Sequence, residues 1–373
     1  MNSLPRALYI HIPWCIRKCP YCDFNSHEQV YPDFSGYGQA LVHDLEADLE
    51  RFGATPFISL FFGGGTPSLF PPNHLEPLFK RLRDLDLIAS DTEITLEANP
   101  GTLDLGHLDG YRDLGINRLS VGVQSFNGEV LKALGRIHGR YQAISMIEHA
   151  KAIGFGRLNV DLMHGTPNQT PAIAREDLNI IRDLEVSHLS WYQLTIEPNT
   201  AFYSKPPTLP EEDILEVTEQ IGSEIIDAMG LHHYEVSAFA KPGQEARHNL
   251  NYWQFGDYFG IGAGAHGKIT TECGVIRTQR TRQPSNYLAR TDFHATEHPL
   301  SDGHLGTECL MNGLRLKSGI SYACFQERTG LNPVEFRSAH LIEADRLDLL
   351  TPGRFQTSEL GWRQLNHILE MLI

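Results

Sequence analysis

The sequence predicts an α/β protein: an incomplete (β/α)6 TIM-like barrel followed by a smaller, mainly helical C-terminal domain. Six runs rich in β-branched and aromatic residues alternate with stretches of helical period up to residue 196, which is typical of a parallel sheet with helices outside it. Polar residues stand at the ends of nearly all these runs, as in barrels that build a site from several strands. The alternation then stops, so we divide the chain into residues 1–239 and 240–373.

Each element follows from its own pattern. The expected strands are 7–12, 57–62, 93–98, 118–123, 157–163 and 188–196. The first helix is expected over 36–53, where Leu41, Leu45 and Leu49 form an apolar stripe and Gly53 is a stop signal. Further helices are expected over 127–135, 141–154 and about 211–229, with a short strand at 233–239. In the second part, 306–316 and 333–350 have the helical pattern.

Composition restricts the class of function. The chain has 31 Lys and Arg against 46 Asp and Glu, a formal net charge of −15, which argues against a nucleic-acid partner. Residues 1–14 lack the apolar region of a signal peptide, and no run approaches 18 apolar residues, so we expect a cytoplasmic protein. Thiols stay reduced there, so the six cysteines do not form a disulfide framework. We expect Cys273, Cys309 and Cys324 to be ordinary buried thiols.

Three other cysteines lie close together in the stretch PWCIRKCPYCDF. Cys15, Cys19 and Cys22 have a spacing that suits either zinc or an iron–sulfur cluster, and His11 and His27 are near enough in sequence to complete a zinc site. Three thiolates on a 4Fe–4S cluster leave one iron open for a reaction. The position where a fourth cysteine might be expected holds Phe24. The spacing therefore favours a cluster with one open iron.

The motifs YIHIPW, CIRKCPYC, FFGGGTPS and LEANP resemble the radical S-adenosylmethionine (SAM) superfamily. The later motifs GVQSF, GRIHG and VDLMHG narrow the resemblance to its coproporphyrinogen-III-oxidase-like branch. The resemblance implies a partial (β/α)6 barrel in which SAM chelates the open iron. It also implies the residues that contact SAM, which are Tyr9, Tyr21, Gly64, Gly65, Thr66, Glu97, Gln124, Arg136 and Asp161.

Within this branch the resemblance allows two main functions. One is the oxygen-independent coproporphyrinogen III dehydrogenase, and the other is the HemW-type haem chaperone. Dehydrogenases of the branch carry a longer N-terminal extension and a fourth cysteine, whereas here fourteen residues precede Cys15 and Phe24 takes the fourth-cysteine place. The segment HNLNYW at 248–253 matches the HNxxYW signature of the chaperones. These features favour a haem carrier over a coproporphyrinogen oxidase.

The signature implies that His248 is a haem ligand and that Tyr252 and Trp253 provide flat apolar surface. Taken alone, these residues also fit a structural role, with His248 satisfying backbone groups and Trp253 in a core. His266 of GIGAGAHG is a second candidate ligand. The resemblance further implies delivery of haem to respiratory, membrane-associated proteins, and a homodimer. A radical SAM enzyme acting on another small substrate stays open, because fold and cluster do not fix the substrate.

Overall fold

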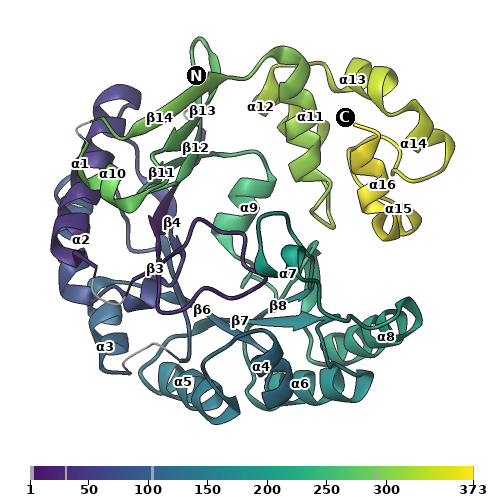
Figure 1. Ribbon diagram of the computed structural model, residues 1–373. Coiled ribbons are helices and arrows are strands. Elements are labelled where there is room, and N and C mark those ends of the chain that lie inside the picture. The colour runs from purple at the N-terminus through teal and green to yellow at the C-terminus, as the bar shows by residue number, and fades with distance from the viewer. Residues whose placement is uncertain (1–3, 30–31, 102–104, 291, 373) are drawn as a thin grey trace.

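Six parallel strands, each predicted from the sequence, form the middle of one curved sheet (Figure 1). The computed structural model describes residues 4–29, 32–101, 105–290 and 292–372. The six strands are β1 Arg6–Ile12, β4 Phe57–Gly64, β5 Glu93–Ala98, β6 Arg118–Gln124, β7 Arg157–His164 and β8 His188–Gln193. They lie side by side in chain order, so the predicted barrel-like α/β fold is confirmed.

Helices cover the outer side of these strands (Figure 1). They are α1 Phe34–Phe52, α2 Pro72–Asp84, α3 Leu105–Leu114, α4 Gly128–Ala133, α5 Arg140–Ala152, α6 Pro171–Asp183 and α8 Glu212–Ala228, with the short η1 Pro67–Leu69 and α7 Ala201–Ser204 in loops. Helix α1 begins where the Asp33 side chain accepts a hydrogen bond from the Gly36 N–H, and it ends at Gly53, whose φ is +80°. Its predicted stripe packs inward, since Leu41 and Leu45 are fully buried.

The sheet continues beyond the six strands at both ends. At one end, β11 Asp257–Ile261 pairs in parallel with β1, and β12 His266–Thr271, β13 Gly274–Arg280 and β14 His294–Pro299 follow antiparallel. At the other end, β10 Ala238–Ala240 and β9 His232–Glu235 add a hairpin in the place of the single strand expected at 233–239. Helices α9 Arg247–Trp253 and α10 Pro284–Leu288 lie between these strands in sequence. The sheet thus runs through residue 240, and the division of the chain there stays a prediction.

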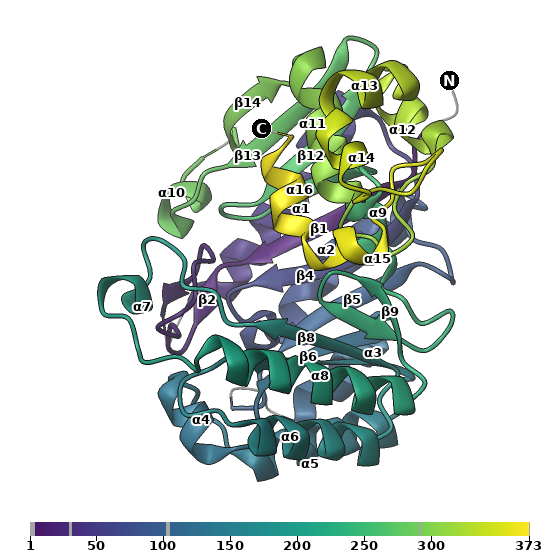
Figure 2. The ribbon, with the colours of Figure 1, turned by 90° about the vertical axis from the view of Figure 1, so that its right-hand side faces the viewer.

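The last seventy residues form the helical part of the molecule. Its helices are α11 Asp302–Gly313, α12 Tyr322–Thr329, α13 Pro333–His340, α14 Ile342–Arg346, α15 Glu359–Arg363 and α16 Leu365–Glu370. They enclose an apolar cluster around Leu310, Phe325 and Phe355, to which Phe255 and Val275 of β13 also contribute from outside the helical part. Figure 2 shows them gathered together, apart from α4, α5, α6 and α8. The predicted helical C-terminal region is therefore confirmed.

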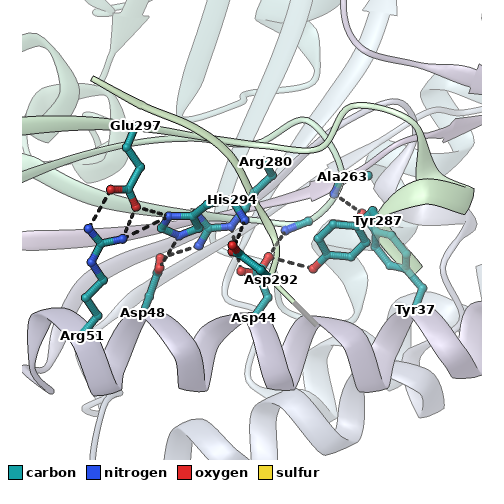
Figure 3. A network of polar contacts seen from close by, with 11 residues as sticks. Tyr37, Asp44, Asp48, Arg51, Ala263, Arg280, Tyr287, Asp292, His294 and Glu297 are labelled. Carbon is teal, nitrogen blue, oxygen red and sulfur yellow. Dashed lines mark hydrogen bonds and ion pairs between the residues drawn. The ribbon is translucent and has the colours of Figure 1, made fainter. Parts of the chain in front are cut away.

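A buried polar network ties the sheet extension to α1 (Figure 3). The Arg280 guanidinium of β13 donates from Nε to Asp44 Oδ1 at 2.7 Å and from Nη2 to Asp48 Oδ2 at 2.6 Å. Asp44 also accepts from the Tyr287 hydroxyl at 2.8 Å, and His294 Nε2 lies 3.0 Å from Asp48 Oδ1. The Arg280 and Asp44 side chains have no exposed surface, so these charges stabilise the fold only as a paired set.

Two predictions drawn from composition can be compared with the structure. None of the helices in the described ranges has both the length and the apolar character needed to cross a lipid bilayer. Cys309 is fully buried, as predicted, and Cys324 is half-buried. The prediction of a buried Cys273 is wrong, because this residue is exposed in the turn between β12 and β13.

Candidate functional site

The three clustered cysteines lie in a loop that is closed at its base by two short paired strands. Strand β2 Trp14–Cys15 pairs in parallel with β3 His27–Glu28. The His27 N–H donates to the Pro13 carbonyl at 2.7 Å, and the Gln29 N–H donates to the Cys15 carbonyl at 3.1 Å. This pairing follows β1 directly, so the loop projects from the carboxyl end of the parallel strands, where barrels of this kind place their sites.

Each of the three thiols has a side-chain hydrogen-bond partner at long distance. Thr66 Oγ1 lies 3.5 Å from the Cys15 sulfur, Arg136 Nη1 lies 3.6 Å from the Cys19 sulfur, and Ser26 Oγ lies 3.9 Å from the Cys22 sulfur. Burial raises the pKa of Cys15 and of Cys22, so both thiols are protonated at neutral pH unless a metal binds them. Three thiols with hydrogen-bond donors beside them are a donor set that fits an anionic iron–sulfur cluster.

The alternative zinc site needs histidine nitrogens that are free to bind. Both nitrogens of His11 are engaged, because Nδ1 lies 3.0 Å from the Tyr9 hydroxyl and Nε2 lies 2.8 Å from the Asn25 carbonyl oxygen. Burial, its largest influence, lowers the pKa of His11 to about 4. Over the described ranges, no three His, Cys, Asp or Glu side chains converge closely enough to hold one metal ion.

The cysteine loop covers a pocket at the carboxyl ends of the strands, which we call the cysteine pocket. With one exception, the structure brings to this pocket every residue that the sequence predicted for the cluster and SAM. These are Cys15, Cys19, Cys22, Tyr21, Gly64, Gly65, Thr66, Glu97, Gln124, Arg136 and Asp161. The exception is Tyr9, which lines a neighbouring cavity instead. The strand-end pattern in the sequence therefore located the pocket, while the role of each residue stays a prediction.

Two glycines let the backbone pass close to the loop. Gly64 has a φ of +115°, and a Cβ there would lie 2.6 Å from the His11 ring. A Cβ on Gly65 would lie 2.6 Å from the Trp14 carbonyl oxygen. The Gly64 N–H donates to Glu97 Oε2 at 3.2 Å, which orients that carboxyl group. Other residues would push the backbone out of the pocket, so the GGGTP segment is required for its shape.

Two carboxyl groups face the pocket floor. Burial, strengthened by nearby Asp161, raises the pKa of Glu97 to about 8. Burial also raises the pKa of Asp161, although Asn159 Nδ2 donates to it at 2.7 Å and Ser120 Oγ at 3.3 Å. Glu97 is therefore mostly protonated at neutral pH and can both donate and accept a hydrogen bond, which suits the binding of hydroxyl groups.

Gln124, whose φ is +72°, also lines the cysteine pocket. Its side-chain oxygen accepts from the Tyr192 hydroxyl at 2.8 Å, and Arg136 donates to the Gly122 carbonyl. Arg136 Nε is buried and has no partner within the described residues. Arg136 thus keeps donor capacity inside the pocket, where it can pair with a ligand carboxylate.

Sequence reasoning missed Ser120, Gly122 and Tyr192 as lining residues of this pocket. Ser120 and Gly122 precede Gln124 in β6 at two-residue spacing, and Tyr192 lies in β8. Alternate residues of a strand point to the same face, so extending the pattern back from Gln124 would have found the first two. Tyr192 had a weaker signal, since it lies within a largely apolar run.

A second cavity of about 640 Å³ adjoins the cysteine pocket, and Phe24, Gly64 and Glu97 line both. Its other lining residues include Tyr9, His11, His248, Tyr252, Tyr258 and His266. Phe24 keeps 61% of its surface exposed, a high fraction for a large apolar side chain. A volume of several hundred Å³ with aromatic walls and a few polar groups is typical of pockets for organic ligands and cofactors.

His248 reaches this cavity from α9, the short helix formed by the HNLNYW segment. Its ring stacks on Phe61 of β4 with ring centroids 4.7 Å apart, and it lies 6.2 Å from the Tyr9 ring. Burial lowers the pKa of His248 to about 3, so its imidazole is neutral at physiological pH. Within the described residues, neither ring nitrogen has a hydrogen-bond partner. A neutral imidazole with a free lone pair in a cavity is suited to binding a metal.

The other two residues of the signature point in different directions. Tyr252 lies one turn from His248, lines the cavity and contacts Tyr258, with ring centroids 5.5 Å apart. Trp253 is not brought to the cavity, since it packs against the C-terminal apolar cluster and its Nε1 donates to Glu235 Oε2 at 2.9 Å. His266, the second candidate ligand, lies at the cavity edge and is exposed.

Comparison with known proteins gives consistent results. Residues 9–181 match the model of the radical SAM superfamily, and residues 300–363 match that of the HemN C-terminal domain. The heme chaperone HemW of Escherichia coli is 44% identical over 99% of this chain and 98% of its own length, and that of Haemophilus influenzae is 43% identical over the same shares. The structure of coproporphyrinogen III oxidase (HemN) from Escherichia coli superposes with a TM-score of 0.83 at 23% identity, covering 99% of this chain and 90% of that one, and shows the shared fold.

Proposed function

Because this chain belongs to the HemW family of the radical SAM superfamily, we propose that it is a haem chaperone that also carries a 4Fe–4S cluster and SAM. The observation that supports this most is the position of His248. Its neutral, unpartnered imidazole lines a cavity of about 640 Å³ that shares a wall with the cysteine pocket. Haem would take His248 as an axial ligand there, with Tyr252 and Tyr258 against the porphyrin.

In this proposal Cys15, Cys19 and Cys22 hold the cluster, and the cysteine pocket holds SAM. A reduced cluster with an open iron supplies an electron that can cleave SAM. Gly64, Gly65 and Thr66 would approach the methionyl part, because the backbone there is free to come close. Glu97 would bind the ribose hydroxyls, supported by Asp161 and Gln124, and Arg136 would pair with the methionyl carboxylate. Tyr21 would border the methionyl end beside the cluster.

The acceptors in this proposal are haem-requiring respiratory proteins associated with the membrane. A chaperone must release its cargo, and a single axial histidine in a cavity whose lining includes the exposed Phe24 and His266 would permit release. The protein would act in the cytoplasm, where its thiols stay reduced, and a homodimer would be its assembled form.

An oxygen-independent coproporphyrinogen III dehydrogenase is the second candidate function, since the observed fold also occurs in an enzyme of that activity. The two functions are separated by offering the anaerobically reconstituted protein two ligands. With coproporphyrinogen, SAM and a reductant, we expect no protoporphyrinogen. With haem, we expect stoichiometric binding and a Soret band shifted from that of free haem. Protoporphyrinogen formation would refute the chaperone proposal, and turnover of SAM with a different small molecule would favour a third activity.

The ligand assignment is tested by His248→Ala with His266→Ala as its control. Loss of an axial imidazole should shift the Soret band and weaken haem binding, because the iron–nitrogen bond is removed. His266→Ala should leave the band unchanged. If His266→Ala shifts the Soret band and His248→Ala does not, the ligand is His266. If neither substitution changes the band or the affinity, haem binds outside this cavity.

The cluster assignment is tested by Cys19→Ala, with Cys309→Ala as a matched control on a buried thiol elsewhere. We expect the first variant to lose iron and sulfide after reconstitution, and the second to keep both. Addition of SAM should alter the EPR spectrum of the reduced cluster in the wild type, because the open iron gains a ligand. An EPR spectrum that does not change when SAM is added, or the presence of one zinc ion per chain, would overturn this assignment.

A further inference from the structure

One edge of the second cavity carries several hydrogen-bond donors. Arg282 lies two residues beyond the end of β13, and Gln279 of β13 pairs in register with His266 of β12. This edge is fixed against the cysteine loop, because Asn25 Nδ2 donates to the backbone oxygens of Arg282 at 2.9 Å and Ala263 at 3.0 Å. We call Arg282, Gln279 and His266 the donor edge.

Among the described residues that line the cavity, Arg282 is the one with a permanently positive side chain. Its guanidinium makes no ion pair or hydrogen bond within the described residues. Asp23 also lines the cavity, but no ion pair links the two side chains. Arg282 lines the same cavity as His266, His248 and Tyr258. The donor edge therefore presents a cationic side chain that is not paired within the described residues.

The chemistry of the remaining wall restricts the ligand. Tyr252 and Tyr258 are aromatic and contact each other, so this wall suits the flat apolar body of a ligand. Glu97 is mostly protonated at neutral pH and does not offset the charge of Arg282. One cavity thus combines an aromatic wall with a cationic edge, which fits a planar molecule that carries carboxylate groups.

We propose that Arg282, assisted by the amide of Gln279, binds the carboxylates of a planar tetrapyrrole whose iron is held by His248. This inference rests on the proposed haem-binding function and adds that the cavity recognises the acidic side of its ligand. A guanidinium presents a rigid fork that matches a carboxylate, and hydrogen bonds to charged groups are stronger than neutral ones.

Titration of the full-length protein with haemin and with its dimethyl ester tests the proposal. Arg282→Ala should weaken haemin binding about tenfold, the lower end for a charge-assisted hydrogen bond because the residue is exposed. It should leave the ester's affinity and the Soret maximum unchanged, since the axial ligand stays. The substitution keeps the backbone oxygen that Asn25 uses, so the edge should remain in place.

Arg290→Ala is the matched control, because Arg290 is exposed eight residues further along and does not line the cavity. It should bind haemin like the wild type. Equal haemin affinity in the wild type and Arg282→Ala, or an equal loss for both ligands, would overturn the role of Arg282 while the chaperone function stands. A wild type that binds neither ligand would overturn both.

Discussion

Replacing Arg280 by methionine should destabilise the protein by about 3–5 kcal/mol, the usual cost of removing one partner of a buried ion pair. Arg280 and Asp44 are fully buried and Asp48 is 1% exposed, so the substitution leaves two carboxylates without their cation. Asp44 keeps its hydrogen bonds from Tyr287 and Gly262, and Asp48 keeps His294, which places the expected loss near the lower end of that range.

Urea unfolding of the cluster-free protein, followed by far-UV circular dichroism, measures this loss as a lower midpoint at similar slope. Adding Asp44→Asn and Asp48→Asn to Arg280→Met should recover part of the stability, because no unpaired charge is then buried. Arg290→Met controls for the loss of an exposed charge. A loss below about 1 kcal/mol, or a further loss in the triple variant, would refute the view that paired buried charges hold the sheet extension to α1.

Four further outcomes are expected. Phe24→Cys should not create coproporphyrinogen decarboxylation in an anaerobic assay. If this activity did appear, the protein would be a dehydrogenase that has lost its fourth cysteine and not a haem carrier. Gly64→Ala should weaken SAM binding measured by calorimetry, since its Cβ would meet the His11 ring at 2.6 Å, whereas Gly156→Ala, with no atom within 4 Å, should not. Because the pKa of Glu97 is raised to about 8 in the folded protein, the free energy of unfolding of the wild type should decrease as the pH rises from about 4.5 to 8. In Glu97→Gln this decrease should be smaller, because the group no longer titrates. Trp253→Phe should lower the unfolding free energy by about 1–3 kcal/mol through its lost hydrogen bond, with unchanged haem affinity.

The parallel strands could be predicted from the sequence because each is a short buried run between helical stretches. Strand β5 Glu93–Ala98 has the predicted bounds, and the other five differ by one to three residues at an end. The pairing of β11 with β1 could not be predicted in this way. It joins Arg6 to Asp257, and a local pattern does not reveal a partner some 250 residues away.

The cysteine pocket was predicted more fully than the second cavity. Polar residues at strand ends must converge at one end of a parallel sheet, so the pocket follows from topology. Trp253 shows the limit of this reasoning: spacing places it next to Tyr252, but the packing of α9 against the helical part directs its ring away from the cavity. Of the donor edge, the sequence indicated His266 alone, because Arg282 and Gln279 stand in no recognisable motif, and Arg282 meets the cysteine loop through a tertiary contact of its backbone with Asn25.

The anchoring of the cysteine loop by Asn25 also constrains the order of events during synthesis. The loop leaves the ribosome first, yet the backbone oxygens that anchor it belong to Ala263 and Arg282, and the strand that covers the free side of β1 begins at Asp257. At about 5–20 residues per second, roughly 10–50 s pass before these partners exist. For most of translation the nascent thiols therefore stand in a loop that lacks its hydrogen bonds from Asn25 to Ala263 and Arg282. Cluster insertion is expected to follow chain completion, and a chain stopped before Asp257 should be unable to retain one.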